Sequence, residues 1–105
     1  FEPEELLGKK LRALYQRKKG RDLFDLYYAI SNLDLDISGI IHSFKEYMAF
    51  SVERPPTRKQ FLLNMEQKLG DPDFKGDIYG LLRPGVEYGQ ARAYEWIKTV
   101  LLENV

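Results

Sequence analysis

The sequence has no cysteine and only one histidine among its 105 residues. Without cysteine the chain can form no disulfide, no thiolate zinc site and no cysteine nucleophile. This composition fits the cytoplasm, where we expect the protein to be located. His42 has no second histidine to help it hold a metal, and zinc needs about three or four protein ligands. We therefore interpret His42 as a structural or exposed residue and predict no metal ligands in the chain.

Long apolar runs and an excess of one charge are also missing. No run approaches the roughly 20 apolar residues that span a bilayer, so we expect no membrane partner. The 16 Lys and Arg residues balance the 16 Asp and Glu residues, whereas a domain that coats nucleic acid is usually basic overall. The acidic start and the lack of an initiator methionine argue against a signal peptide and for a fragment or an isolated domain.

Apolar residues recur at helical spacing in six segments, and no segment shows a convincing strand pattern. The expected helices span about residues 3–16, 21–31, 37–50, 58–69, 72–82 and 89–102. With 44% hydrophobic residues a core is available. The sequence therefore predicts an all-α fold, a single bundle of about six helices that occupies residues 1–105.

Several residues mark where these helices begin and end. Asp36, Thr57 and Asp71 are expected N-caps, and Thr57 is followed three residues later by Gln60, which completes a capping box. The paired prolines at 55 and 56 end the third helix. Gly20 is expected to provide the turn between the first two helices.

The stretch from Lys9 to Tyr28 concentrates charge on both sides of that glycine. Lys10 and Arg17 are seven residues apart and can share a helix face, and Asp22 and Asp25 share a face of the next helix. Lysine and arginine neutralise a triphosphate, and a carboxylate binds a metal or orients an attacking hydroxyl. The alternative is a salt-bridged surface hairpin without function, and the pattern alone favours it, since exposed ion pairs are common and contribute about 0–1 kcal/mol each.

The same stretch resembles a known motif. Lys10-Leu11-Arg12-Ala13-Leu14, then Arg17, then Arg21-Asp22-Leu23-Phe24-Asp25-Leu26-Tyr27, is similar without a gap to the C-terminal motif of the AbiEii/AbiGii-type nucleotidyltransferase toxins. These toxins belong to type IV toxin–antitoxin and abortive-infection systems. The similarity continues more loosely through Phe74, Asp77 and Ile78, a Leu-Leu-x-Pro-Gly turn, and a last helix with Ala91 and Trp96.

The resemblance implies transfer of a nucleotide from an NTP, with Mg²⁺, to an RNA or protein acceptor. Lys10 would contact the triphosphate and, with Asp22, form the catalytic pair, Asp22 as the catalytic carboxylate. Arg17 and Arg21 would support phosphate binding or hold the carboxylates, and Asp25 would be an accessory partner at the nucleotide site. A cognate antitoxin is also implied.

One departure limits what the chain can do alone. In the family the nucleotidyltransferase core lies N-terminal to this motif, and it has a Gly-Ser or Gly-Gly turn and a strand with two metal-binding aspartates. The sequence contains neither a Gly-Ser nor a Gly-Gly dipeptide. The Asp34–Asp36 and Asp71–Asp73 segments are explained as helix caps. We therefore expect a C-terminal helical part that lacks its N-terminal catalytic half, holds no metal or nucleotide, and transfers no nucleotide by itself.

Other features leave a second function open. Most aromatic residues are expected in the core, but Tyr28 could line a nucleotide or an RNA end. Arg54, Arg58 and Lys59 form a second basic cluster, interpreted either as a solvated helix start or as an RNA-backbone contact. The alternative function is a non-catalytic helical module that binds nucleic acid or a protein partner.

Overall fold

All regular structure in the described part of the chain is helical. The computed structural model describes residues 2–51, 56–78 and 88–105. Its elements are α1 (Pro3–Gln16), α2 (Gly20–Asn32), α3 (Ile37–Ser51), α4 (Arg58–Leu69), α5 (Pro72–Gly76) and α6 (Gln90–Val100), followed by a short 3₁₀ helix, η1 (Leu102–Asn104). The predicted all-α fold with six helices is confirmed for these residues.

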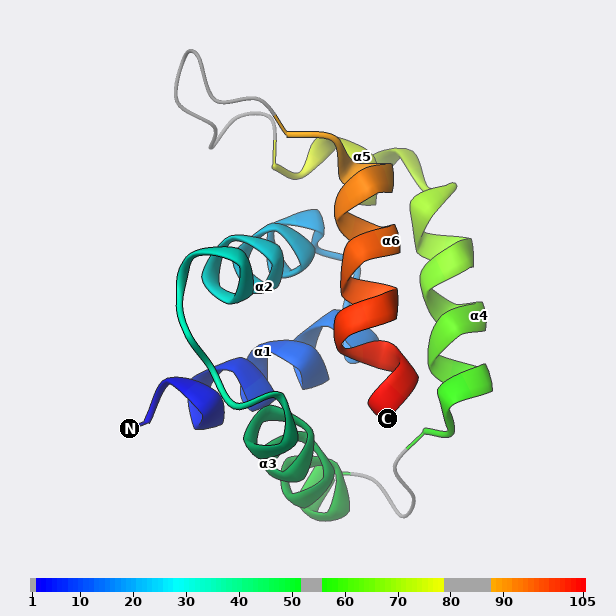
Figure 1. Ribbon diagram of the computed structural model, residues 1–105. Coiled ribbons are helices and arrows are strands. Elements are labelled where there is room, and N and C mark those ends of the chain that lie inside the picture. Colours follow the sequence, from blue (N-terminus) through cyan, green and yellow to red (C-terminus); the bar gives the residue numbers. More distant parts are fainter. Residues whose placement is uncertain (1, 52–55, 79–87) are drawn as a thin grey trace.

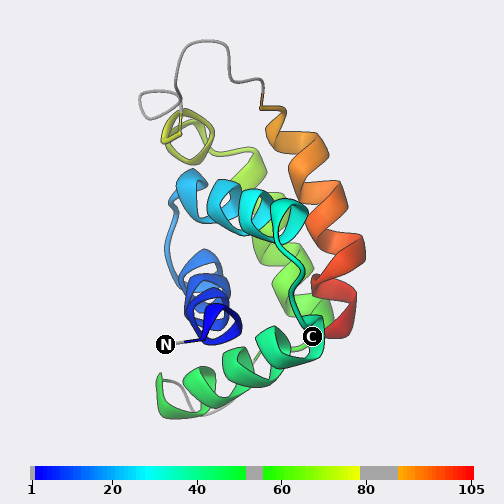
Figure 2. The same ribbon diagram turned by 60° about the vertical axis from the view of Figure 1, so that its left-hand side comes forward.

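The first two helices form a hairpin on which the rest of the bundle is built. α1 and α2 are in contact and cross each other, so that they form a V-shaped pair rather than a parallel-sided one (Figures 1 and 2). α3 crosses α1 on the side away from α2, and α4 and α6 stand upright beside the hairpin (Figures 1 and 2). The end of α1 and the start of α2 therefore lie close to α4 and α5.

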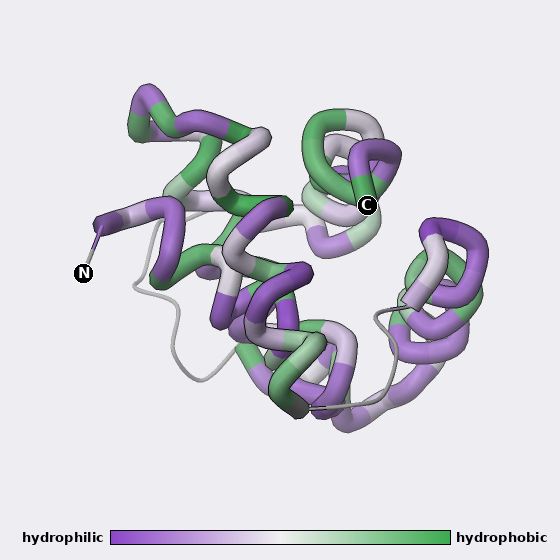
Figure 3. Tube along the Cα trace, turned by 90° about the horizontal axis from the view of Figure 1, so that it is seen from below, coloured by the Kyte–Doolittle hydropathy of each residue, from purple (hydrophilic) through white to green (hydrophobic). Residues whose placement is uncertain are grey.

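One hydrophobic core joins these helices. Hydrophilic and hydrophobic residues alternate along the helical tubes in Figure 3, as expected of amphipathic helices with one buried stripe. Burying one large apolar side chain stabilises the fold by about 1.5–3 kcal/mol. The core includes Leu7, Leu11, Leu14, Leu23, Leu26, Ile40, Phe44, Met48, Phe61, Met65, Phe74, Tyr94, Ile97 and Leu101.

The predicted helix starts are confirmed by their hydrogen bonds. The Gln60 N–H donates to the Thr57 hydroxyl at 3.2 Å, and the Thr57 N–H donates to the Gln60 side chain at 2.9 Å, which makes the capping box reciprocal. The Asp71 carboxylate accepts from the Asp73 N–H at 2.8 Å, and Asp36 caps α3 by accepting from the Ser38 N–H at 3.1 Å. Such caps each stabilise a helix by about 1 kcal/mol.

The predicted fifth helix is too long. α5 ends at Gly76, and Asp77 and Ile78 form a turn, whereas the sequence predicted helix to about Leu82. Glycine is a poor helix residue, and the Asp77 carboxylate accepts a hydrogen bond from the backbone of α2. The rest of that prediction, residues 79–82, and most of the following loop lie outside the described residues.

Gly20 does not serve as the turn residue that the sequence predicted. α1 already ends at Gln16, with Arg17 in an extended conformation, and Gly20 is the first residue of α2. A Cβ on Gly20 would lie 2.2 Å from the backbone oxygen of Phe74. The position needs glycine because α5 approaches α2 closely there.

Candidate functional site

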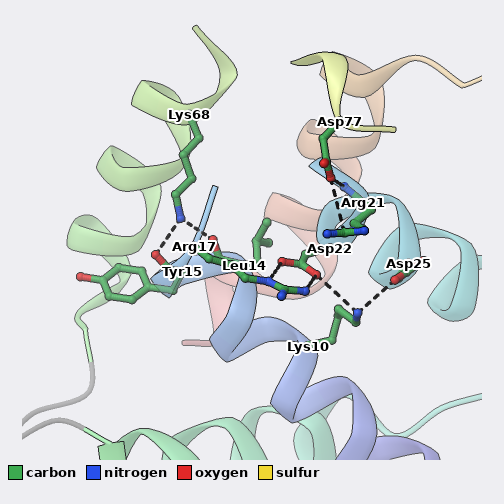
Figure 4. A network of polar contacts seen from close by, with 9 residues as sticks. All are labelled: Lys10, Leu14, Tyr15, Arg17, Arg21, Asp22, Asp25, Lys68 and Asp77. Atoms are coloured by element: carbon green, nitrogen blue, oxygen red, sulfur yellow. Dashed lines mark hydrogen bonds and ion pairs between the residues drawn. The ribbon is translucent and has the colours of Figure 1, made fainter. Parts of the chain in front are cut away.

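Asp22 is the centre of the charged hairpin. Its side chain is fully buried in the first turn of α2, and both of its oxygens accept hydrogen bonds. Arg17 donates from Nε to Oδ2 and from Nη2 to Oδ1, each at 2.8 Å. Lys10 Nζ lies 3.4 Å from Oδ1 and 3.1 Å from the Asp25 carboxylate (Figure 4). A two-bond arginine–carboxylate pair fixes both groups in one orientation.

The end of α1 explains how Lys10 and Arg17 meet the same carboxylate. Lys10 lies within α1 on the side that meets Asp22 and Asp25 of α2, whereas Arg17 is the first residue after the helix. The Arg17 N–H still bonds to the Ala13 oxygen at 2.9 Å, but its own backbone is extended, with φ −131° and ψ 165°. The chain therefore leaves α1 at Arg17 while the guanidinium lies against α2.

The electrostatics of the pair favour the charged forms. The hydrogen bonds to Asp22 raise the pKa of Arg17 above its usual value. The Arg17 side chain nevertheless remains 48% exposed and the Lys10 side chain 29% exposed. A guanidinium has five N–H donors, and Asp22 uses two of them. Both cations can therefore still reach an anionic ligand from solvent.

Arg21 lies beside this cluster but pairs with a different carboxylate. Its backbone N–H donates to Asp77 Oδ2 at 3.1 Å, and its Nε lies 3.7 Å from the same oxygen. Of the predicted site residues, the structure thus brings Lys10, Arg17, Asp22 and Asp25 into one network. Arg21 is adjacent in α2 and directed toward the turn after α5 (Figure 4).

Lys68 belongs to the same region, and the sequence analysis missed it. Its ammonium donates to the backbone oxygens of Leu14 and Tyr15, the latter at 2.6 Å, and the residue is only 6% exposed. Burial lowers the pKa of Lys68 to about 8. The sequence does carry a sign that Lys68 is buried, because Lys68 follows Phe61 and Met65 on the buried stripe of α4. A buried lysine needs a specific partner.

The other sequence candidates lie elsewhere. His42 is exposed, with Nε2 3.0 Å from Glu46. Tyr28 is exposed and stacks on Phe24 with ring centres 5.7 Å apart. Arg58 and Lys59 are exposed at the start of α4. Arg54, the third member of that cluster, lies outside the described residues.

The described part of the chain has neither a metal-ligand cluster nor a membrane-spanning helix. Within residues 2–51, 56–78 and 88–105, no three His, Cys, Asp or Glu side chains are grouped so that they could hold a metal. In those ranges no helix combines the length and the apolar character needed to cross a bilayer.

Comparison with protein families gives a match over nearly the whole chain. Residues 1–99 match the family model described as nucleotidyl transferase AbiEii toxin, type IV toxin–antitoxin system. The chain therefore belongs to the AbiEii family of nucleotidyltransferase toxins, as the resemblance predicted, and the family implies an antitoxin partner. Comparisons with curated proteins and with solved structures gave no match.

Proposed function

We propose that the α1–α2 hairpin is the phosphate-binding part of a nucleotidyltransferase site, which transfers a nucleotide from an NTP to an RNA or protein acceptor. Lys10 and Arg17 hold the triphosphate, and Arg21 and Asp25 assist at its edge. The helical chain acts as the C-terminal part of this site, and a nucleotidyltransferase core completes it. An antitoxin restrains the transfer.

The observation that carries this proposal is the buried carboxylate of Asp22 between two partly exposed cations. A purely structural ion pair gives little stability, and apolar residues in its place are often as stable or more so. Here Asp22 is fully buried while Arg17 keeps about half of its side chain in solvent. The arrangement holds two cations in a fixed orientation at a surface, which is what recognition of a phosphate chain needs.

We propose a positioning role for Asp22 beside the catalytic role implied by the resemblance. Both Asp22 oxygens are engaged by Arg17 and Lys10. A general base must reach the proton it removes, so catalysis by Asp22 requires that a substrate displaces Lys10 or Arg17. Positioning alone requires no such displacement.

The described residues fit an NTP but not its magnesium ion. Lys10 and Arg17 provide donors for phosphate oxygens. Mg²⁺ prefers several oxygen ligands in octahedral geometry, and the described residues group no such carboxylates. In this proposal the metal ligands come from the nucleotidyltransferase core.

A titration with ATP tests the phosphate-binding role directly. The sequence alone led us to expect no bound nucleotide, but the two partly exposed cations now predict that calorimetry on the 105-residue chain detects binding. Arg17→Met and Lys10→Met should each weaken it by about tenfold, the loss of one charge-assisted contact of about 1.4 kcal/mol. Lys45→Met removes an exposed lysine of α3 and should leave the affinity unchanged. Equal affinity of all four proteins, or no binding by any, would contradict the proposal.

A transfer assay separates the two roles of Asp22. Radiolabel from α-labelled NTPs should enter RNA only when a nucleotidyltransferase core of the family is joined to the chain. If Asp22 is the base, Asp22→Asn abolishes transfer while ATP affinity is kept. If Asp22 only positions the cations, the same variant weakens ATP affinity, and transfer recovers at saturating ATP.

A further inference from the structure

The C-terminus of α1 leaves backbone oxygens that the helix itself does not satisfy, among them those of Leu14 and Tyr15. In a continuing helix, Leu14 and Tyr15 would accept from the N–H groups four residues later, at positions 18 and 19. The chain instead becomes extended at Arg17 and reaches α2 at Gly20. Buried helix ends need replacement donors, and a positive charge there is favoured by the helix dipole.

Lys68 of α4 satisfies both oxygens from 53 and 54 residues away in the sequence. Its ammonium also lies 5.9 Å from the centre of the Tyr15 ring, within cation–π range. The attraction of Asp22 favours the charged form, and the nearby charge of Lys18 opposes it. The side chain is thus buried between the last turn of α1, the Tyr15 ring and the charged hairpin (Figure 4).

This contact lies directly before the residue that binds Asp22. Tyr15 is two residues before Arg17, and Arg17 meets Asp22 from the extended backbone that follows the end of the helix. A donor that occupies the Leu14 and Tyr15 oxygens removes the partners that another turn of α1 would need. Another turn would rotate Arg17 into helical geometry and change the direction of its side chain.

We infer that Lys68 is a positioning residue for the proposed phosphate site: by ending α1 at Gln16 it directs the Arg17 guanidinium onto Asp22. This inference rests on the proposed function for its biological meaning. The orientation of Arg17 itself can be measured without any nucleotide.

The primary test is nuclear magnetic resonance on the 105-residue chain. The ¹³C chemical shifts of Arg17 Cζ and Asp22 Cγ report the pair and need no exchangeable proton. Lys68→Met keeps the aliphatic side chain but removes the donors, and should shift both signals toward values for unpaired groups. Lys68→Arg keeps donors and should restore at least part of the wild-type shifts. Lys45→Met, at an exposed position of α3, should leave both signals unchanged.

A second readout links the orientation to the ligand. ATP affinity should fall by about tenfold in Lys68→Met, as for direct loss of one contact, and recover in Lys68→Arg. If the wild-type chain binds no ATP, the proposed function fails, while the chemical shifts still decide the positioning role. A folded Lys68→Met chain with wild-type shifts overturns the inference even if ATP binds normally to both proteins.

Folding of the variants is checked by circular dichroism. If the Lys68→Met chain does not fold, the Lys68→Gln variant is used in its place. The glutamine amide keeps N–H donors, but its side chain is shorter and ends before the Leu14 and Tyr15 oxygens. The expected result is the same displacement of the Arg17 and Asp22 signals. If neither variant folds, Lys68 is required for the whole fold, and a specific role in directing Arg17 is refuted.

Discussion

Asp22 and Asp25 are three residues apart in one motif, yet α2 places them in different environments. The Asp22 side chain is fully buried, whereas the Asp25 side chain is 45% exposed. Only Asp22 receives the two arginine hydrogen bonds. A carboxylate that is removed from water depends on its partners far more than one at the surface does.

Replacement of these two aspartates should therefore have unequal effects. Asp22→Asn keeps the shape but faces an amide N–H toward Arg17, and should lower the free energy of unfolding by about 2–4 kcal/mol. Asp25→Asn, the matched control, should cost less than about 1 kcal/mol. Urea unfolding measures both changes. Equal losses would show that Asp22 contributes no more than a surface ion pair.

Lys68 should make the free energy of unfolding increase as the pH rises into the alkaline range. Burial lowers its pKa in the folded state to about 8 from an ordinary 10.5, so the unfolded chain binds more protons between these values. Stability then rises with pH in this window. From pH 7.5 to pH 9.5 the expected gain is about 2 kcal/mol. In Lys68→Met the gain should disappear, and urea unfolding at the two pH values checks it.

Tyr94 should limit this increase at higher pH. Burial raises the pKa of Tyr94 to about 12 from 10, so the folded chain retains a proton that the unfolded chain has lost, and stability falls again above about pH 10. The measurement at pH 9.5 therefore isolates Lys68.

Between helices, the contacts are close enough that glycine is required at particular positions. Gly8 faces α3, where a Cβ would lie 2.6 Å from the Ser43 Cβ. Gly20 faces α5, where the obstacle is a backbone oxygen that cannot rotate away. The hairpin and the helices beside it are thus fitted to each other through backbone as well as side chains.

Gly20→Ala should be one of the most harmful small substitutions in the chain. The added methyl group must displace α5 or α2, at a cost of about 2–3 kcal/mol. Gly76→Ala is the control, because no atom lies within 4 Å of a Cβ there, and alanine favours helix, so stability should stay the same or rise by up to about 1 kcal/mol. Thermal unfolding compares the two. A tolerated Gly20→Ala would mean that α5 moves easily.

The limits of sequence-based prediction follow from the same contacts between elements. The helix starts at Pro3, Thr57 and Asp71 were predictable because caps and prolines act within a few residues. The spacing of Lys10 and Arg17 predicted a shared helix face, and both do meet Asp22, although Arg17 reaches it from extended backbone beyond the helix. The roles of Lys68 and Asp77 were not, because each contacts backbone more than 50 residues away, and no local pattern encodes such a pairing.

At the scale of the whole molecule, the described helices share one core. The radius of gyration is 13.2 Å, close to the roughly 13 Å expected for a compact chain of this length. The core cluster takes residues from every α-helix and from η1. The single tryptophan, Trp96 of α6, packs edge-on against Tyr27 of α2 with ring centres 5.4 Å apart.

This shared core predicts cooperative unfolding. Far-ultraviolet circular dichroism reports all helices, whereas Trp96 fluorescence reports only the contact between α6 and α2. The two melting curves should coincide, as expected for a two-state transition in a small domain. A tryptophan transition several degrees below the loss of helix would instead mean that α6 separates from the hairpin first.

The bond between Arg21 and Asp77 has a further consequence for how the site comes into being. The family motif lies within residues 10–27, so it is translated before positions 68 and 77, yet its geometry depends on partners at those two positions. Contacts of such long sequence separation form late, because the intervening chain must first lose its freedom. A nascent chain that has emerged only through α3 therefore carries the complete motif without the arrangement that would let it hold a triphosphate.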